Sequence, residues 1–202
     1  GREPEFAGTA LPTGGDCSRM PATERLLIEP LTAAHAAELF AALDHPEVGT
    51  YLGGPDVTTV DAMVERIAHL AAGPGPAWPD EKWWNFVVRR ADSGDVIGRI
   101  EATTYGDWGE VAYVFGPASW GAGYATEAMH WLIEFAQAQE AVDLWAAVHP
   151  LNDRSIRLLT RLGFTAQPTP PQRPLGSYDE GDDVFRLAAD LPGQLSTVSV
   201  RP

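Results

Sequence analysis

The chain has 202 residues, 45% of them hydrophobic, which is enough for one domain with a sizeable core and too short for two full domains. Its formal net charge of −14 opposes electrostatic attraction to nucleic acids and to anionic membranes, and no apolar run is long enough to cross a bilayer. We therefore expect a cytoplasmic protein without nucleic-acid or membrane partners. The charge favours a cationic ligand, although acidity that serves solubility alone is the alternative.

The two ends of the chain differ from its middle. Residues 1–19 show no hydrophobic periodicity and suggest a flexible leader or a cloning remnant, which makes Met20 a candidate natural start. The single cysteine, Cys17, lies in this leader, so neither an internal disulfide nor a catalytic thiol is expected. We expect a single domain at 20–192, followed by a C-terminal tail at 193–202. No spacing of His, Cys or carboxylates suggests a metal site, so we predict none.

The first half of the domain predicts one strand, two helices and an antiparallel meander. An apolar stripe in the second helix consists of Val60, Met63, Val64, Ile67, Ala68 and Ala71. In chain order, the expected elements are a strand at 25–30, a helix capped by Thr32 that ends near 44–46, a helix capped by Thr58 or Thr59 that stops at 73–76, and strands at 82–91, 95–105 and 109–115.

The second half predicts two strand-to-helix steps and a closing strand. A Pro-rich, acidic loop at 167–183 precedes the closing strand. The expected elements are a helix at 121–139, a strand at 142–148, a helix capped by Asn152 that ends before a left-handed Gly163, a strand from Phe164, and a strand at 183–189.

A glycine-bearing turn joins the strand at 109–115 to the helix at 121–139. Glycines let the backbone pass close to a ligand, and the first turn of the following helix adds free N–H donors and the positive end of its dipole. The turn lacks the Lys-Ser/Thr ending of a nucleotide P-loop and the third glycine of a dinucleotide fingerprint. It therefore suits a pyrophosphate, with a tight connection that binds nothing as the alternative.

Two motifs resemble the GNAT superfamily of N-acyltransferases. The turn is similar to its acyl-CoA-binding pattern, Arg/Gln-x-x-Gly-x-Gly/Ala, with Trp120, Gly123 and Ala125 at the three places. The run from Asn152 to Phe164 matches the superfamily's Asn-x-x-Ser, helix, Gly-Phe ending. With Arg-Leu-Leu-Ile-Glu-Pro-Leu near the start, the pattern most resembles the branch of ribosomal-protein N-terminal acetyltransferases, over residues 24–189.

The resemblance implies an α/β fold of the α+β type. Its mixed, mostly antiparallel sheet has six to seven strands, is flanked by about four helices, and splays at the fourth and fifth strands, where acyl-CoA lies. The implied activity is acetyl transfer from acetyl-CoA to a primary amine by a monomer or homodimer. A protein N-terminal α-amine is the first expected acceptor, and a polyamine, aminoglycoside or similar small cation is the second. A CoA-binding sensor without activity is a further alternative, because Trp120 departs from the pattern.

The resemblance also indicates cofactor-binding residues. A backbone N–H around 113–115 is expected to receive the acyl carbonyl, as in other oxyanion holes. Trp120 puts the side-chain contact to the pyrophosphate in doubt, while the backbone contacts remain. The residues expected to bind acetyl-CoA are Val114, Phe115, Trp120, Gly121, Ala122, Gly123, Tyr124, Ala125, Thr126, Asn152 and Ser155.

Catalytic and acceptor-binding candidates complete the prediction. Glu110 is the candidate base, and its rivals are Asp107, His149 and the carboxylates of 179–183. The resemblance to the ribosomal-protein branch implies Ser155, the serine of Asn-x-x-Ser, as the acid, although a serine in a first helical turn needs no catalytic role. Many other members of the superfamily use a tyrosine near that turn, and the corresponding helix here carries none. The acceptor cleft is expected to be bordered by Glu110 and by flat rings that suit a cation or a sugar face, or that simply pack: Trp83, Trp84 and Trp108, with Trp78 nearby.

Overall fold

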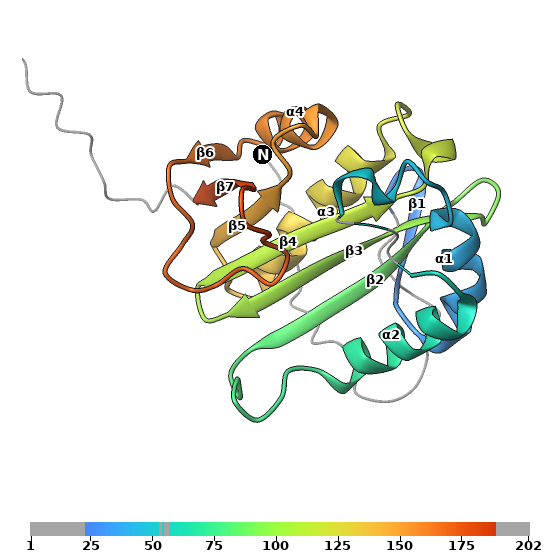
Figure 1. The fold of residues 1–202 in the computed structure, drawn as a ribbon, viewed down its shortest axis with the longest axis horizontal. Helices are drawn as coiled ribbons and strands as arrows, with labels where there is room; N and C mark the ends of the chain where they lie inside the picture. Colours follow the sequence, from blue (N-terminus) through green and yellow to red (C-terminus); the bar gives the residue numbers. More distant parts are fainter. Residues whose placement is uncertain (1–22, 53, 55–56, 189–202) are drawn as a thin grey trace, which may run out of the picture.

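The computed structural model describes residues 23–52, 54 and 57–188 (Figure 1). The predicted leader, Cys17 and the tail lie outside these residues. One seven-stranded sheet runs in the order β1-β2-β3-β4-β5-β7-β6. The strands are β1 (Leu26–Pro30), β2 (Lys82–Arg90), β3 (Val96–Tyr105), β4 (Trp108–Phe115), β5 (Asp143–Val148), β6 (Thr165–Gln167) and β7 (Asp183–Ala188).

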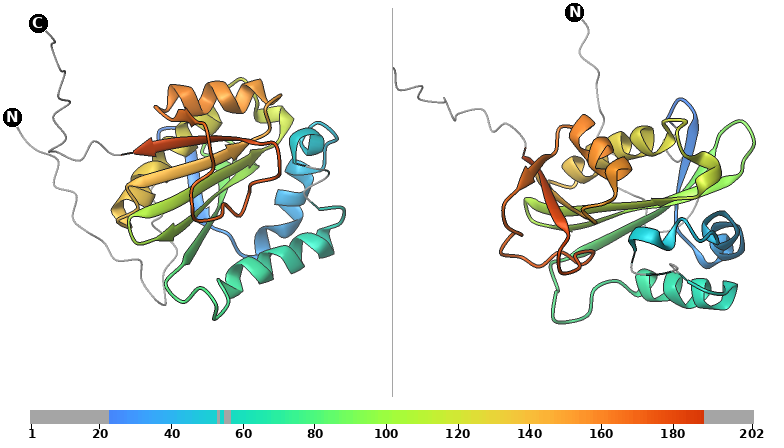
Figure 2. Two further views of the ribbon diagram at one scale, coloured as in Figure 1. Left: turned by 60° about the vertical axis from the view of Figure 1, so that its left-hand side comes forward. Right: turned by 45° about the horizontal axis from the view of Figure 1, so that its top comes forward.

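The pairing of the strands confirms the predicted fold class. Strands β1 to β4 form an antiparallel meander, and β7 pairs antiparallel with both β5 and β6. Strands β4 and β5 are parallel. Helices cover both faces of the sheet (Figure 2). They are α1 (Ala36–Leu43), α2 (Val60–Ala72), α3 (Tyr124–Ala138) and α4 (Asp153–Arg161), with short 3-10 turns η1 (Ala33–His35), η2 (Gly49–Tyr51) and η3 (Pro117–Ser119).

Helices α1 and α2 pack on one face, and their starts follow the predicted caps. Thr32 precedes η1, which leads into α1, and the Thr59 side chain accepts a hydrogen bond from the N–H of Ala62 at the start of α2. The predicted stripe of α2 is only partly correct. Met63 and Ile67 are buried in the core with α1, whereas the other four predicted positions are exposed. The buried face of α2 is narrower than predicted, because α1 is the one described α-helix that packs against it.

Helices α3 and α4 pack on the opposite face and enclose the larger core. Ala128, Met129 and Leu132 of α3 are fully buried beneath β1, β3 and β4, and Leu159 of α4 joins the same cluster. Helix α4 ends at the predicted place, since Gly163 has a φ of 92°, a backbone conformation that side chains disfavour. The helices cover the two faces of the sheet, and the candidate site lies between the facing edges of β4 and β5.

Candidate active site

Strands β4 and β5 separate after a short parallel contact. Their pairing runs from Trp108 opposite Asp143 to Glu110 opposite Trp145. Beyond this point β4 continues to Phe115 and β5 to Val148, and these described parts of the two strands are not paired with each other. The expected splay is therefore present, and it opens a split whose walls are backbone edges.

The β4 edge offers backbone donors to this split. The N–H of Gly116 donates to Ile97 on β3, and hydrogen-bonded pairs alternate along an antiparallel ladder. The backbone of Val114 therefore faces β3, whereas that of Tyr113 and Phe115 faces the split. This narrows the sequence prediction, because the N–H of Val114 is directed away from a ligand in the split. Its side chain lines the cavity described below.

The turn after β4 begins at a close backbone approach. A Cβ on Gly116 would lie 2.1 Å from the carbonyl oxygen of Ala42 in α1, so no side chain fits there. Gly121 and Gly123 then take positive φ values of 78° and 83°. Because these two glycines are not helical, α3 begins at Tyr124 and not at residue 121, where the sequence predicted it.

The resulting turn has the character of an anion cradle. The N–H groups of residues 121–126 have no recorded backbone acceptor in the described part of the chain, and the first helical bond is from Glu127 to Gly123. Residues 121–123 are exposed, and the positive end of the α3 dipole lies behind them. All predicted residues of the turn thus lie together at one end of the split, with Ala125 and Thr126 in the first turn of α3.

Arg25 braces the outer side of the cradle, a contact that the sequence motifs did not predict. Its Nη1 donates to the carbonyl oxygen of Ala122 at 2.9 Å, and its Nε donates to Glu127 at 2.7 Å. The guanidinium also lies 4.8 Å from the ring centroid of Tyr124. Because the C=O and N–H of a trans peptide point in opposite directions, this bond turns the N–H of Gly123 inward.

The first turn of α4 lies on the other wall of the split. The Asn152 side chain accepts from the N–H of Ser155 at 3.2 Å, so its capping role is confirmed. The Ser155 hydroxyl lies 2.8 Å from the Tyr113 hydroxyl, which reaches across from β4. Burial raises the pKa of Tyr113 to about 12, against the opposing effect of the Ser155 hydrogen bond. A neutral phenol therefore stands beside the predicted acid, a pairing that required the fold to be seen.

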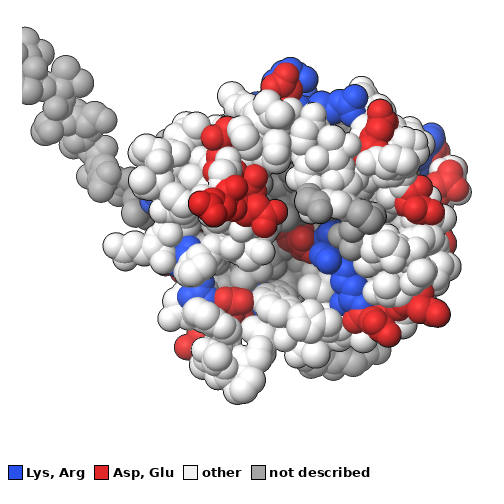
Figure 3. Space-filling model, viewed as in Figure 1, with Lys and Arg blue, Asp and Glu red and all other residues white. Residues whose placement is uncertain are grey.

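A cavity of about 660 Å³ opens on the α2 side and extends into the split (Figure 3). Trp83, Trp108 and Trp78 line it, as expected for the acceptor cleft. Trp84 does not: its indole N–H donates to Thr104, and its ring packs edge-on against Phe135 of α3, with centroids 5.1 Å apart. Neighbouring residues of a strand face opposite sides of the sheet, so Trp84 is a core residue.

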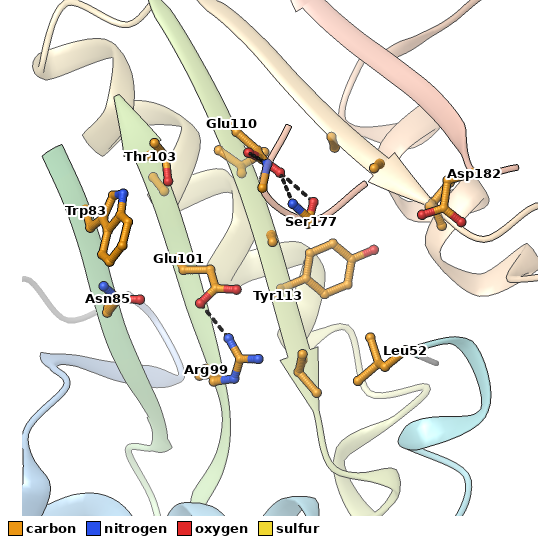
Figure 4. Close-up of a pocket in the computed structure, with 18 of the residues that line it drawn as sticks. Leu52, Trp83, Asn85, Arg99, Glu101, Thr103, Glu110, Tyr113, Ser177 and Asp182 are labelled. Carbon is orange, nitrogen blue, oxygen red and sulfur yellow. Dashed lines mark hydrogen bonds and ion pairs between the residues drawn. The ribbon is translucent and has the colours of Figure 1, made fainter. Parts of the chain in front are cut away.

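Glu110 lies in this cavity with its carboxylate already engaged (Figure 4). It accepts from the N–H of Gly176, and from the N–H and the hydroxyl of Ser177, at 2.7, 2.9 and 2.5 Å. The residue is 6% exposed. A carboxylate has about four acceptor positions, so one position on Oε2 remains for a further donor. Of the predicted rivals, His149, Asp179 and Asp182 also line the cavity, whereas Asp107, Glu180 and Asp183 do not.

The loop at 168–182 forms one wall of the cavity and is fixed by Arg173. The guanidinium forms an ion pair with Glu81 and lies over Tyr105, Trp108 and Trp78, at 4.1, 5.2 and 5.1 Å from their ring centroids. Residues from three distant segments meet here, so no local pattern predicts the arrangement.

The floor of the cavity carries a second charged pair that the sequence did not single out. Arg99 and Glu101 are two residues apart on β3, and Nη1 of Arg99 lies 2.5 Å from Oε2 of Glu101 (Figure 4). Their side chains are 5% and 26% exposed. Residues two apart on a strand lie on the same face, so the alternation of a strand predicts that these two side chains are neighbours. It does not predict that this face lines a cavity.

The described residues contain neither a cluster suited to a metal ion nor a helix suited to a membrane. Within 23–52, 54 and 57–188, no group of three or more His, Cys, Asp or Glu side chains is arranged to hold a metal ion. No helix in these ranges combines the length and apolar character that crossing a membrane requires.

Comparison with known proteins gives a family match that covers most of the chain. Residues 25–165 match the acetyltransferase (GNAT) domain family. A curated relative, the uncharacterized N-acetyltransferase YoaA of Bacillus subtilis (strain 168), is 24% identical over 146 residues, which are 70% of this chain and 80% of the relative.

Solved structures share the fold. A Vibrio cholerae protein named provisionally as a ribosomal-protein-serine acetyltransferase has a TM-score of 0.68 and 21% identity, over 85% of this chain and 98% of that one. An acetyltransferase from Agrobacterium tumefaciens str. C58 has a TM-score of 0.63 and 24% identity, over 89% of this chain and 98% of that one.

Proposed function

Because the chain belongs to the acetyltransferase (GNAT) domain family and is thus an acetyl-CoA-dependent N-acyltransferase, we propose that it acetylates a primary amine bound in the 660 Å³ cavity. One observation carries the proposal: the cradle of free N–H groups and the cavity lie at the two ends of the same split. A donor held by its pyrophosphate in the cradle then presents its thioester where the split meets the cavity. The transfer is direct, with no enzyme-bound acetyl group.

The residues around the split suit the two halves of this reaction. The amine nitrogen attacks the thioester carbon, and the backbone N–H of Tyr113 faces the oxygen that gains charge. The remaining acceptor position of Glu110 accepts a hydrogen bond from the acceptor amine, and the carboxylate takes the proton that the nitrogen loses as the amide forms. As the carbon–sulfur bond breaks, the electron pair goes to sulfur, and the hydrogen-bonded hydroxyl pair of Tyr113 and Ser155 supplies the proton that converts the leaving thiolate to a thiol.

The acceptor that we place first is a protein N-terminal α-amine. The cavity is open and extended, and it carries rings together with both signs of charge, from Arg99 and Glu101 on the floor to Arg173 in the wall. Such a surface suits the varied side chains of a peptide. The name of the Vibrio cholerae structure agrees with this choice. A small cationic amine is the second candidate, favoured by the net charge of −14 and by the cavity-lining carboxylates of Asp179 and Asp182.

A thiol-release assay with acetyl-CoA tests the proposal and separates the two acceptors. The panel contains matched peptides with free and with blocked N-termini, together with polyamines and aminoglycosides. We expect turnover with free N-termini and none with blocked ones. Turnover confined to small cations would favour the second candidate, and CoA binding without turnover on any acceptor would favour a sensor.

A further inference from the structure

The first position of the CoA-binding pattern holds Trp120, which carries no charge for a phosphate. The Trp120 indole N–H donates to the carbonyl oxygen of Phe115 at 2.7 Å, and the side chain is half-buried. The ring is thus fixed to the end of β4, directly before the first free N–H of the cradle at Gly121. A fixed ring at this position is a platform on which another side chain can rest.

Arg154 of α4 rests on that platform. Its guanidinium carbon lies 4.3 Å from the centroid of the Trp120 ring. Among the residues that the structure describes, no carboxylate forms an ion pair with Arg154, and its side chain is exposed. One turn further along α4, Arg157 is instead paired with Asp153 at 3.7 Å. The charge of Arg154 therefore remains available to a ligand.

The position of Arg154 over the Trp120 ring leaves its N–H donors without a hydrogen-bond partner among the described residues. Stacking uses the face of the planar guanidinium, while its N–H donors point outward in the plane, where they match two oxygens of a phosphate. The ring that supports it belongs to the residue next to Gly121, so the cation stands at the edge of the cradle.

We propose that Arg154 binds the pyrophosphate of CoA, with Trp120 as the positioning residue that holds the guanidinium beside the cradle. This inference rests on the proposed function. It assigns the positive charge that the family pattern places at the first position of the turn to a residue of a different helix.

Calorimetric titration with CoA, without any acceptor, tests the assignment. Arg154→Ala is expected to weaken CoA binding roughly 10- to 100-fold, because charge-assisted hydrogen bonds are lost. The matched control Arg157→Ala, on the same helix and also exposed, is expected to bind like the wild type. Equal binding by Arg154→Ala and the wild type, or an equal loss in both variants, would overturn the proposal.

A second variant tests the role of Trp120. Trp120→Arg restores the usual pattern, so we expect it to recover most of the affinity when it is added to Arg154→Ala. No recovery in a double variant that remains folded by circular dichroism would contradict the assignment of the missing charge.

Titration with 3′-dephospho-CoA identifies the phosphate. The loss in Arg154→Ala should persist with this ligand, and its disappearance would move the contact to the 3′-phosphate and overturn the pyrophosphate assignment. If the wild type binds neither ligand, the proposed function itself fails. If the wild type binds and the variants do not differ from it, the inference about Arg154 alone fails.

Discussion

The two ends of the split are built in different ways. The cradle comes from one short stretch, Phe115 to Thr126, and its ligand-facing groups are backbone N–H groups. The acceptor cavity collects side chains from α2, β2, β3, β4 and the loop at 168–182. Donor binding therefore depends mainly on local backbone geometry, with the proposed Arg154 contact added from α4, whereas acceptor choice depends on side chains held by long-range contacts. Substitutions at the two ends should separate CoA affinity from acceptor turnover.

The largest expected effect is at the cradle. Gly123→Asp adds a side chain at a φ of 83°, with its Cβ 3.4 Å from Nη2 of Arg25, so it strains the cradle backbone, disturbs the Arg25 contact and adds a negative charge to the turn. CoA affinity should therefore fall by at least roughly 100-fold, or about 2.8 kcal/mol. Calorimetric titration measures it. Gly94→Asp is the matched control, since Gly94 has a φ of 75° in the β2–β3 turn with open space around it. Similar CoA affinity in both variants would exclude the cradle as the binding site.

The next effect is at Glu110 and should leave CoA binding unchanged. Glu110→Gln removes the candidate base, and turnover is expected to fall roughly 10²-fold, with partial rescue at high pH as more of the amine is neutral. Both kcat and CoA affinity are measured.

The control for this variant addresses the loop that Glu110 holds. Ser177→Ala removes one donor to the carboxylate and keeps the charge. If Ser177→Ala is as slow as Glu110→Gln and neither responds to pH, Glu110 anchors the loop and the base lies elsewhere.

A moderate effect is expected at Arg173. Arg173→Ala removes the ion pair with Glu81 and the contacts with three rings, so the loop wall should loosen and the acceptor KM should rise about 10-fold. Steady-state kinetics with a verified acceptor measure this. Arg186→Ala, which breaks a surface ion pair with Asp143 outside the cavity, is the control. A change in CoA affinity without a change in acceptor KM would contradict the separation of the two ends.

The last effect is on stability and is confined to alkaline pH; it concerns the Tyr113 hydroxyl. Its pKa is raised to about 12, so the unfolded chain releases this proton near pH 10 while the folded chain retains it. The stabilisation is therefore complete below pH 10 and is lost as the pH rises to 12. The free energy of unfolding of Tyr113→Phe should therefore fall less than that of the wild type between pH 10 and 12, by up to about 2.7 kcal/mol. Denaturant titrations at a series of pH values measure the difference. Parallel curves for both proteins would contradict the shifted pKa.

The sequence predicted best what short stretches determine. Alternation located the strands, Asn152 and Thr59 capped the helices as expected, and the glycines marked the cradle. Residues that meet across the fold escaped prediction. The Tyr113–Ser155 contact joins β4 to α4, and Arg173 reaches aromatic rings more than sixty residues away, so neither leaves a periodic pattern.

Two predictions were wrong for a related reason: the full apolar stripe of α2, and the place of Trp84 at the acceptor cleft. A pattern shows that one face of a helix or strand is apolar, and the strand alternation places Trp83 and Trp84 on opposite faces. Which face meets the core is decided by the neighbouring elements. For Trp84 that neighbour is α3, through Phe135.

The short contact between β4 and β5 has a mechanical consequence. Three residue pairs join β4 to β5 at one end, so the half of the sheet that contains β3 and β4 can move relative to the half that contains β5 and β7. A ligand that spans the open part adds attachment where the strands have separated. Binding of acetyl-CoA should then reduce the motion of both halves of the sheet, including strands that the ligand does not touch. Amide hydrogen exchange in β5 and β7 should slow together with that in β3 and β4.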